Sequence, residues 1–326
     1  MPNEQNALPA PAVGTLLSER FELGGILGRG GMGVVYRAHD RSSGRPVAIK
    51  VALRPLGAKA LARFRREAEL LMRFAHDNIV KGNALIEHDG LVAFTMELVP
   101  GTELLELIDE GGAFQEDAAL YVVLQIARAL THMYEHGVVH RDIKPGNILI
   151  TSDNTVKLCD LGLASGGDTE AGDGVTVGTV EYISPEQAMG EGGVDVRSDI
   201  YALGVTLYHL VVGEIPFSGS DDQETMAKRF VETLSSPKLA HTSPHVHYFI
   251  QKMMATEMDM RYQSPSELID DVEESIRGKK TLTVNPLSQG ESALELKRPF
   301  AKADKKKSGA PVPRSSKSSK GRRHRR

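Results

Sequence analysis

The alternation of apolar and polar residues predicts strands in the first hundred residues. Residues 21–40, FELGGILGRGGMGVVYRAHD, place apolar and β-branched side chains on both sides of a glycine cluster, and PVAIKVAL (46–53) follows the turn signal RSSGR. We therefore expect three strands joined by two turns. The stretch 79–99, IVKGNALIEHDGLVAFTMELV, predicts further strands.

One helix interrupts these strands, and helices dominate after Pro100. In residues 58–75, apolar side chains recur at three- and four-residue steps, at Leu61, Phe64, Ala68 and Leu71, which predicts an amphipathic helix. Later segments with a helical pattern are 116–137, 198–213, 245–258 and 264–278. The pattern predicts an α+β chain in which a small β-rich unit with one main helix precedes a larger α-rich unit.

The two ends of the chain differ from this body in composition. Residues 1–19 mix proline with alanine and asparagine, which predicts a flexible leader. Residues 279–326 hold Lys, Ser, Pro and Gly with few large apolar side chains, too few to offset the entropy of ordering. We expect a folded unit over 20–278, divided into 20–99 and 100–278, and a disordered tail.

Cysteine content and hydropathy limit the kind of protein. The single cysteine, Cys159, excludes an intramolecular disulfide and a cysteine-rich metal site, so we expect an intracellular, cytoplasmic protein. No apolar run approaches the ~18 to 20 residues that span a bilayer. The longest, Tyr201 to Gly213, is interrupted by His209 and predicts a buried helix.

Charge is distributed unevenly along the chain. The net charge of the chain is -4. Residues 297–326 contain thirteen Lys and Arg and one acid, a net charge of +12, so the rest of the chain carries a net charge of -16. A basic tail on an acidic body favours electrostatic contact with a polyanion or nucleic acid. The alternative is a solvated tail that only aids solubility.

The glycine cluster GRGGMGVV matches G-x-G-x-x-G-x-V through Gly28, Gly30, Gly33 and Val35. Such clusters also occur in plain hairpins, and in dinucleotide-binding folds, where a helix follows directly. Here the strand VVYRAHD follows, which disfavours the dinucleotide fold. A glycine hairpin without side chains can bring its amide groups close to phosphate oxygens.

Lys50, in VAIK, lies on an apolar strand. Alone it would be a lysine whose stem packs at a strand edge while its ammonium reaches water. The helix that follows supplies Glu67 as a partner, and an ion pair would leave other donors of the lysine for phosphate oxygens. Glu69 lies about 200° around the helix from Glu67, so only one of them can face Lys50.

The stretch VVHRDIKPGNILI (138–150) places charged residues at fixed spacing between two apolar segments. A short loop of this kind between buried strands favours chemistry over solubility. The polar residues are His140, Arg141, Asp142, Lys144 and Asn147, and DLG follows at Asp160.

In this order, the glycine cluster, VAIK, a helix glutamate, HRDIKPGN and DLG are the motif set of protein kinases. The chain resembles bacterial Hanks-type (eukaryotic-like) serine/threonine protein kinases over about residues 20–277. The resemblance implies the bilobal protein kinase fold, with a small β-rich lobe and a larger helical lobe. It also implies ATP-dependent transfer of phosphate to Ser and Thr hydroxyls of protein substrates, with autophosphorylation, in signal transduction.

The resemblance assigns roles that phosphoryl transfer requires. Asp142 would orient the attacking hydroxyl and Lys144 would hold the γ-phosphate, with Lys50 and Glu67 completing the catalytic set. Asn147 and Asp160 would hold Mg²⁺, with Mn²⁺ as the alternative metal. The residues that would contact ATP are Gly28, Gly30, Gly33, Val35, Ala48, Lys50, Glu97, Val99 and Leu149, with Met96 as gatekeeper.

Other residues would support the site. The resemblance implies a structural His140 packed under Leu161, an Asp199 that braces the catalytic loop, and an ion pair between Glu186 and Arg261. Leu161 replaces the usual Phe, and SPE replaces Ala-Pro-Glu; neither change is expected to abolish activity.

The segment between Asp160 and Glu186 would receive the substrate and switch activity. Thr179 would hydrogen-bond Asp142 and Lys144, and Arg141 would pair with a phosphate on Thr176 or Thr169. Val175 occupies the position that most often accepts this phosphate, and the acids Asp168, Glu170 and Asp173 are an alternative source of charge. Small-molecule kinases generally lack this segment. A scaffold that binds nucleotide without transferring phosphate is the other alternative, and the complete catalytic set disfavours it.

Overall fold

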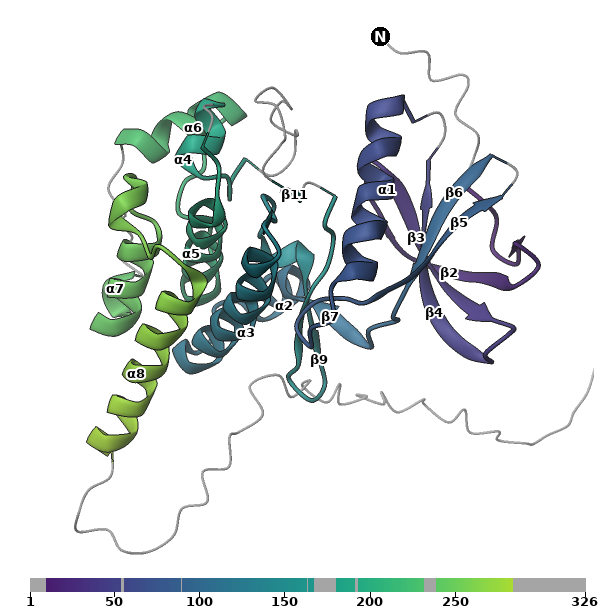
Figure 1. The fold of residues 1–326 in the computed structure, drawn as a ribbon. Coiled ribbons are helices and arrows are strands. Elements are labelled where there is room, and N and C mark those ends of the chain that lie inside the picture. The colour runs from purple at the N-terminus through teal and green to yellow at the C-terminus, as the bar shows by residue number, and fades with distance from the viewer. Residues whose placement is uncertain are drawn as a thin grey trace, which may run out of the picture.

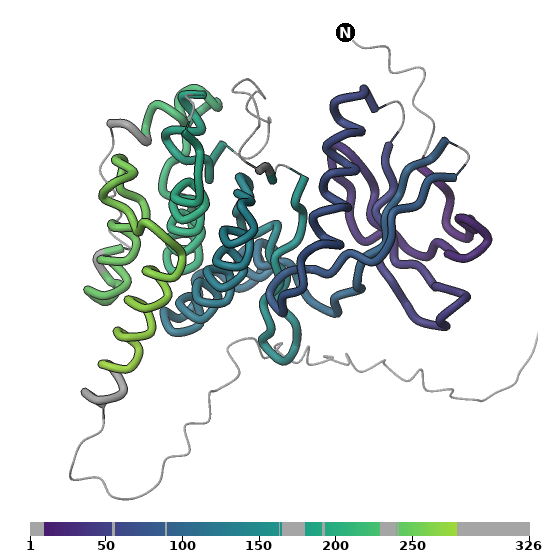
Figure 2. Tube along the Cα trace, in the orientation of Figure 1, coloured from purple at the N-terminus to yellow at the C-terminus, as the bar shows by residue number. Residues whose placement is uncertain are grey.

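The computed structural model describes residues 10–53, 56–88, 90–162, 164–166, 180–190, 193–231 and 239–283. Figure 1 shows a lobe built on a twisted sheet beside a larger lobe of helices. Figure 2 shows the purple-to-blue and the teal-to-green parts of the trace in separate halves of the molecule. The predicted order, β-rich before helical, is confirmed.

The first lobe holds one antiparallel sheet of six strands in the order β1-β2-β3-β4-β6-β5. The strands are β1 (Leu16–Leu17), β2 (Phe21–Arg29), β3 (Gly33–Asp40), β4 (Arg45–Ala52), β5 (Gly82–His88) and β6 (Leu91–Met96). Helix α1 (Ala58–Arg73) buries Phe64, Ala68 and Leu71, which lie on its predicted apolar face. It lies so close to β5 that a Cβ at Gly82 would come within 2.8 Å of Leu71.

The ordered chain begins earlier than the sequence predicted. Residues 10–19, assigned to a flexible leader, contain β1, and Leu17 is buried against the sheet. The hydroxyl of Tyr36 donates to the carbonyl of Pro11 at 2.8 Å. Proline and alanine suggested mobility here, but pairing with β2 satisfies the backbone. Residues 1–9 lie outside the described residues.

The second lobe is mainly helical. Its principal helices are α2 (Leu104–Gly111), α3 (Glu116–Glu135), α4 (Pro185–Met189), α5 (Val196–Val212), α6 (Asp222–Val231), α7 (Pro244–Met253) and α8 (Pro265–Thr283), with short 3-10 turns at Pro145–Asn147, Leu239–His241 and Met258–Met260. Its short strands are β7 (Gly101–Glu103), β8 (Val138–Val139), β9 (Ile148–Thr151), β10 (Val156–Leu158) and β11 (Ser165–Gly166), which pair as β10-β9-β7 and β11-β8. The pattern predicted α3, α5, α7 and α8 but not α2, α4 or α6.

Helix α5 is the centre of the second lobe. All of its residues except Arg197 and Val211 are buried, as its apolar run predicted. Asp195 caps its start by accepting from Arg197 N, and Gly213, at φ 79°, ends it. Within the described chain, none of the helices combines the length and apolarity needed to cross a membrane.

A backbone junction connects the two lobes and places the functional residues. Val80 N donates to Leu158 O at 2.9 Å, and Leu158 N donates to Asn78 O at 2.9 Å. Asn78 Nδ2 donates to Gln125 Oε1 on α3 at 2.8 Å. The chain after α1 is thereby attached to β10, which ends two residues before Asp160.

Candidate active site

Lys50 and Glu67 form the ion pair that the sequence predicted. Lys50 Nζ lies 2.7 and 2.9 Å from the two Glu67 oxygens, and both side chains are buried. Burial lowers the pKa of Lys50, but the carboxylates of Glu67 and Asp160 outweigh it and raise that pKa above its ordinary value. The lysine is therefore a cation. Glu69 is exposed and lies 3.9 Å from Arg66.

Asp160 joins this pair to the helical lobe. Its Oδ1 lies 3.5 Å from Lys50 Nζ and accepts from Gly162 N at 3.1 Å, while its side chain is 45% exposed. Desolvation raises the pKa of Asp160, but Lys50 and the Gly162 N–H outweigh it and hold that pKa below its ordinary value. Asp160 has a left-handed backbone, φ 60°, which is uncommon for a residue other than glycine.

Three polar residues of the HRDIKPGN loop lie together. Lys144 Nζ is 2.8 and 3.0 Å from the Asp142 carboxylate, and Asn147 Nδ2 donates to Asp142 O and Oδ2 at 2.8 and 2.9 Å. The 3-10 turn Pro145–Asn147 positions Asn147. Because the amide nitrogen of Asn147 is occupied by Asp142, its Oδ1 is the atom left to accept or to bind a cation.

The buried side chains of Asp199 and His140 accept hydrogen bonds from the backbone of this loop. Asp199 accepts from His140 N at 2.8 Å and from Arg141 N at 2.7 Å, which confirms its predicted bracing role. Burial raises the pKa of Asp199 to about 7, against the effect of these N–H groups. His140 is fully buried, its Nδ1 accepts from Asp142 N at 3.2 Å, and burial lowers its pKa, so it is a neutral structural ring. Leu161 is also fully buried.

The glycines of the cluster differ in what surrounds them. A Cβ at Gly33 would lie 2.7 Å from Val51 O, so the sheet itself requires glycine there. A Cβ at Gly28 or Gly30 would meet no atom of the described residues within 4 Å, and neither has positive φ, so the described part of the fold does not require glycine at these two positions. A Cβ at Gly162 would lie 2.7 Å from the side chain of Met32, which belongs to the glycine hairpin. The hairpin therefore comes close to Gly162, two residues after Asp160.

The predicted adenine-contacting residues share the sheet face of Lys50. Val35 is opposite Lys50 and Ala48 is opposite Met96, and opposed residues point to the same face of a sheet. Because Ala48 and Lys50 are two residues apart on β4, all four side chains lie on one face. Leu149 comes from β9 in the other lobe.

Glu97 and Val99, whose backbone groups were predicted to bind the adenine edge, lie in the chain between the lobes. Glu97 N donates to Lys81 O at 2.9 Å, and Val99 O accepts from Gly101 N at 2.9 Å. These two bonds leave the Glu97 carbonyl and the Val99 N–H for other partners. The Glu97 side chain pairs with Lys157 at 2.7 Å, a long-range contact that no local pattern signals.

Glu186 and Arg261 form the second predicted ion pair. Arg261 Nη1 and Nη2 donate to the two Glu186 oxygens, each at 2.8 Å, and Ser198 Oγ donates to Glu186 Oε1 at 2.6 Å. Burial alone would raise the pKa of Glu186, but these bonds outweigh it and lower it to about 2. Ser184 caps α4 and forms a capping box with Gln187.

The predicted switch residues Thr169, Thr176 and Thr179 lie outside the described residues. At the end of that segment, Gln187 Nε2 donates to Arg141 O at 3.1 Å. Arg141 has φ 69°, and its Nε is buried without a hydrogen-bond partner among the described residues. Sequence reasoning anticipated neither the left-handed backbone nor the buried nitrogen.

The oxygen atoms at this site can bind a hard cation such as Mg²⁺ if a bound ligand supplies the remaining metal ligands. Within the described ranges, no group of three or more His, Cys, Asp or Glu side chains can hold a metal. Asn147 and Asp160 offer oxygen atoms, which Mg²⁺ prefers, and Mg²⁺ commonly takes its remaining ligands from phosphates and water. The residues therefore fit a metal that arrives with a nucleotide.

Comparison with known proteins is consistent with this geometry. A family model described as "Protein kinase domain" matches residues 21–271. The chain is 35% identical to the serine/threonine-protein kinase PknB of Mycolicibacterium smegmatis, over 91% of this chain and 50% of that protein. It is 36% identical to PknB of Mycobacterium tuberculosis, over 78% and 43%, and 36% identical to a probable serine/threonine-protein kinase of Streptomyces coelicolor, over 81% and 41%. The chain thus spans half or less of the length of these relatives.

Proposed function

Because the chain belongs to the protein kinase domain family, we propose that its folded unit transfers the γ-phosphate of ATP to serine and threonine hydroxyls of proteins. The observation that carries this proposal is the buried Lys50–Glu67 pair, which reaches across the lobes to the half-exposed Asp160. This arrangement supplies a fixed positive charge beside a fixed negative one. Phosphoryl transfer depends mainly on such positioning and charge stabilisation.

The HRDIKPGN loop would act on the acceptor hydroxyl. Lys144 and Asn147 hold the Asp142 carboxylate in one orientation. Asp142 would accept a hydrogen bond from the hydroxyl and direct its oxygen toward the phosphate. The Lys144 ammonium, 2.8 Å from Asp142, would also stabilise charge on the transferred group.

Nucleotide and metal would bind between the two lobes. Asn147 and Asp160 would hold Mg²⁺ or Mn²⁺, which would neutralise charge on the phosphates. Lys50 would hold phosphate oxygens under the backbone of Gly28, Gly30 and Gly33. Val35, Ala48 and Leu149 would enclose the adenine, with the Glu97 carbonyl and the Val99 N–H at its edge. We propose a cytoplasmic location, which fits a single, half-buried cysteine.

The test compares phosphate transfer with nucleotide binding. The purified chain is incubated with labelled ATP, with and without divalent metal, and modified residues are identified by mass spectrometry. Phosphoserine or phosphothreonine in the parent, and none in Asp142→Asn, is the expected result. Nucleotide binding with no transfer in the parent would instead indicate the scaffold alternative, and phosphate on tyrosine alone would contradict the acceptor class.

A phosphate on Thr169 or Thr176 would regulate the site through Arg141. Arg141 Nε, which is buried without a hydrogen-bond partner among the described residues, supports this proposal, because a phosphate offers three acceptor oxygens. We expect phosphate on these threonines in the parent but not in Asp142→Asn. Full activity of an unphosphorylated Thr169→Ala/Thr176→Ala variant would exclude this regulation.

The basic residues 297–326 would contact polyanions such as heparin or nucleic acid. Deleting the residues after Pro286 should spare phosphorylation of a peptide and weaken retention on heparin. Equal retention at low salt with and without these residues would exclude this contact.

A further inference from the structure

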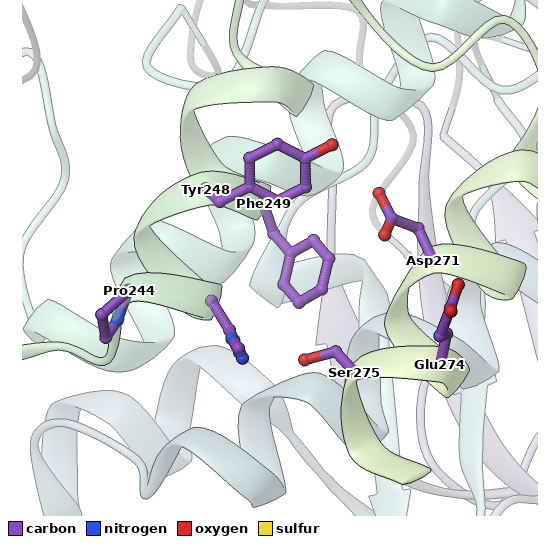
Figure 3. Close-up of a pocket in the computed structure, with 7 residues that line it drawn as sticks. Pro244, Tyr248, Phe249, Asp271, Glu274 and Ser275 are labelled. Atoms are coloured by element: carbon purple, nitrogen blue, oxygen red, sulfur yellow. The ribbon is translucent and has the colours of Figure 1, made fainter. Parts of the chain in front are cut away.

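A hollow of about 280 Å³ lies between α7 and α8, in the part of the helical lobe farthest from the sheet (Figures 1 and 3). Its walls include Pro244, Tyr248 and Phe249 of α7 and Asp271, Glu274 and Ser275 of α8. Sites for drug-sized ligands usually enclose about 300 to 1,000 Å³. The hollow lies at the small end of this range and can take one large side chain.

The hollow is apolar inside and acidic at its rim. Figure 3 shows the rings of Tyr248 and Phe249 on one side and the two carboxylates of α8 on the other. Phe249 is buried, and Tyr248 is 47% exposed. Asp271 accepts from Tyr262 at 2.6 Å and lies 3.7 Å from Lys252, whereas Glu274 is exposed and has no ion-pair partner among the described residues.

A buried polar atom is also unsatisfied at this place. Among the described residues, Ser275 Oγ is buried without a hydrogen-bond partner. A buried hydroxyl without a hydrogen-bond partner lowers the stability of the fold. A backbone or side-chain donor from an occupant would remove that cost. The hollow thus favours an occupant with an apolar group, nearby donors and positive charge.

One segment of this chain has these properties. Phe300 is the only Phe, Tyr or Trp in residues 284–326, and Lys297, Arg298 and Lys302 flank it. We propose that the hollow between α7 and α8 is a docking site for the chain's own basic tail, with Phe300 inside and Arg298 and Lys302 beside Glu274 and Asp271. The aromatic ring supplies apolar contact and the flanking cations supply charge complementarity.

The connection is long enough for this contact. Eight residues of α8 separate Ser275 from its end at Thr283, which is about 12 Å of helix. Seventeen further residues lead to Phe300 and span at most about 58 Å. Tethering also gives the segment an effective concentration on the order of millimolar, so weak contacts suffice.

The absence of tryptophan from this chain permits a direct test. In the full chain, Phe300→Trp introduces a single tryptophan, and Ser315→Trp provides the matched control farther along the tail. We expect Phe300→Trp to show blue-shifted emission and weaker acrylamide quenching than the control, at every protein concentration. Adding Glu274→Lys should abolish the shift by reversing the rim charge, and high salt should diminish it.

A second charge reversal separates docking from general electrostatics. Glu110 on α2 is exposed and far from the hollow in sequence and fold, and Glu110→Lys changes the net charge equally. The blue shift should survive this change. Four results would overturn the proposal. The emission of Phe300→Trp could equal that of the control, the blue shift could survive Glu274→Lys, or both charge variants could lose the shift equally. The shift could also grow with protein concentration, which would show that the tail of a second copy occupies the hollow. None of these readouts depends on catalysis.

Discussion

Two buried ion pairs, one in each lobe, are satisfied to different degrees. In the helical lobe, Arg261 uses all five of its N–H donors: two on Glu186, and one each on the carbonyls of Ala255, Thr256 and Arg197. In the sheet lobe, Lys50 makes two short contacts with Glu67, and its third is a 3.5 Å contact with the half-exposed Asp160.

This difference separates a structural pair from a functional one. A buried pair stabilises a fold only when other hydrogen bonds satisfy the remaining donors and acceptors. The Arg261 pair meets that condition and offers nothing to a ligand. The Lys50 pair keeps one donor weakly used beside an open carboxylate, where phosphate oxygens and a cation can enter. Breaking the first should harm stability, and breaking the second should harm activity.

The largest expected effect is on activity, from Lys50→Met. Loss of the ammonium leaves phosphate charge unneutralised, so we expect phosphoryl transfer to fall by about 10²-fold or more. The loss of stability should be small, because burial already raises the pKa of Glu67 to about 7 and a neutral carboxyl is accessible. Initial rates with labelled ATP and thermal unfolding measure the two effects. A large loss of stability with unchanged rates would reverse the comparison.

Stability should respond most to Arg261→Met. Removing this guanidinium leaves Glu186 with only the Ser198 hydroxyl as a side-chain donor and takes one donor from each of three carbonyls, and breaking a buried pair costs about 3–5 kcal/mol. Arg197→Met is the matched control. Arg197 pairs with two acids instead of one, but both are far more exposed than Glu186, at 43% and 94%, so its loss should cost about 1 kcal/mol or less. Urea denaturation of both variants measures the difference, and equal costs would contradict the interpretation.

Acid should weaken the Glu186–Arg261 pair in the unmodified chain and so reveal its contribution to stability. The pKa of Glu186 is lowered to about 2, from 4.5 in the unfolded chain. Its contribution is therefore complete above pH 4.5 and is lost as the pH falls toward 2, by up to about 3 kcal/mol. Unfolding free energy measured across this range should fall less steeply in Glu186→Gln. An unchanged pH slope would show that Glu186 is not the responsible carboxylate.

The smallest effect separates two neighbouring glutamates on α1. Glu69 is exposed and only 3.9 Å from Arg66, so Glu69→Gln should change stability by less than about 0.5 kcal/mol and leave activity intact. Glu67→Gln should lower activity, because Lys50 loses the charge that positions it. Activity measured in parallel on the two variants tests this difference. Equal losses of activity would mean that the position of Lys50 does not depend on Glu67.

The resemblance to the protein kinase motif set predicted three contacts between distant residues. Lys50 with Glu67, Glu186 with Arg261, and Asp199 with the catalytic loop were all expected from residues far apart in sequence, and the structure confirms each. Local hydrophobic patterns also predicted α1, which buries one apolar face, and α5, which is apolar and buried on nearly all sides.

The features that escaped prediction have no local pattern. Asn78 and Gln125 connect the lobe junction to α3 through hydrogen bonds between residues 47 apart, and no periodicity signals such a pair. The left-handed backbones of Arg141 and Asp160 arise from tertiary contacts rather than from residue type. Strand β1 was missed because pairing with β2 overrides a composition that is typical of mobile leaders.

The contrast among the glycines has an evolutionary consequence. Gly33 is required by the packing of β3 against Val51, whereas no atom of the described residues crowds Gly28 or Gly30. Selection on the fold alone would preserve Gly33, and only selection for a bound ligand would preserve the other two. In a descendant that no longer bound nucleotide, Gly28 and Gly30 would be replaced by other residues while Gly33 persisted. The residue types at the three positions would therefore show separately whether selection had preserved nucleotide binding and whether it had preserved the fold.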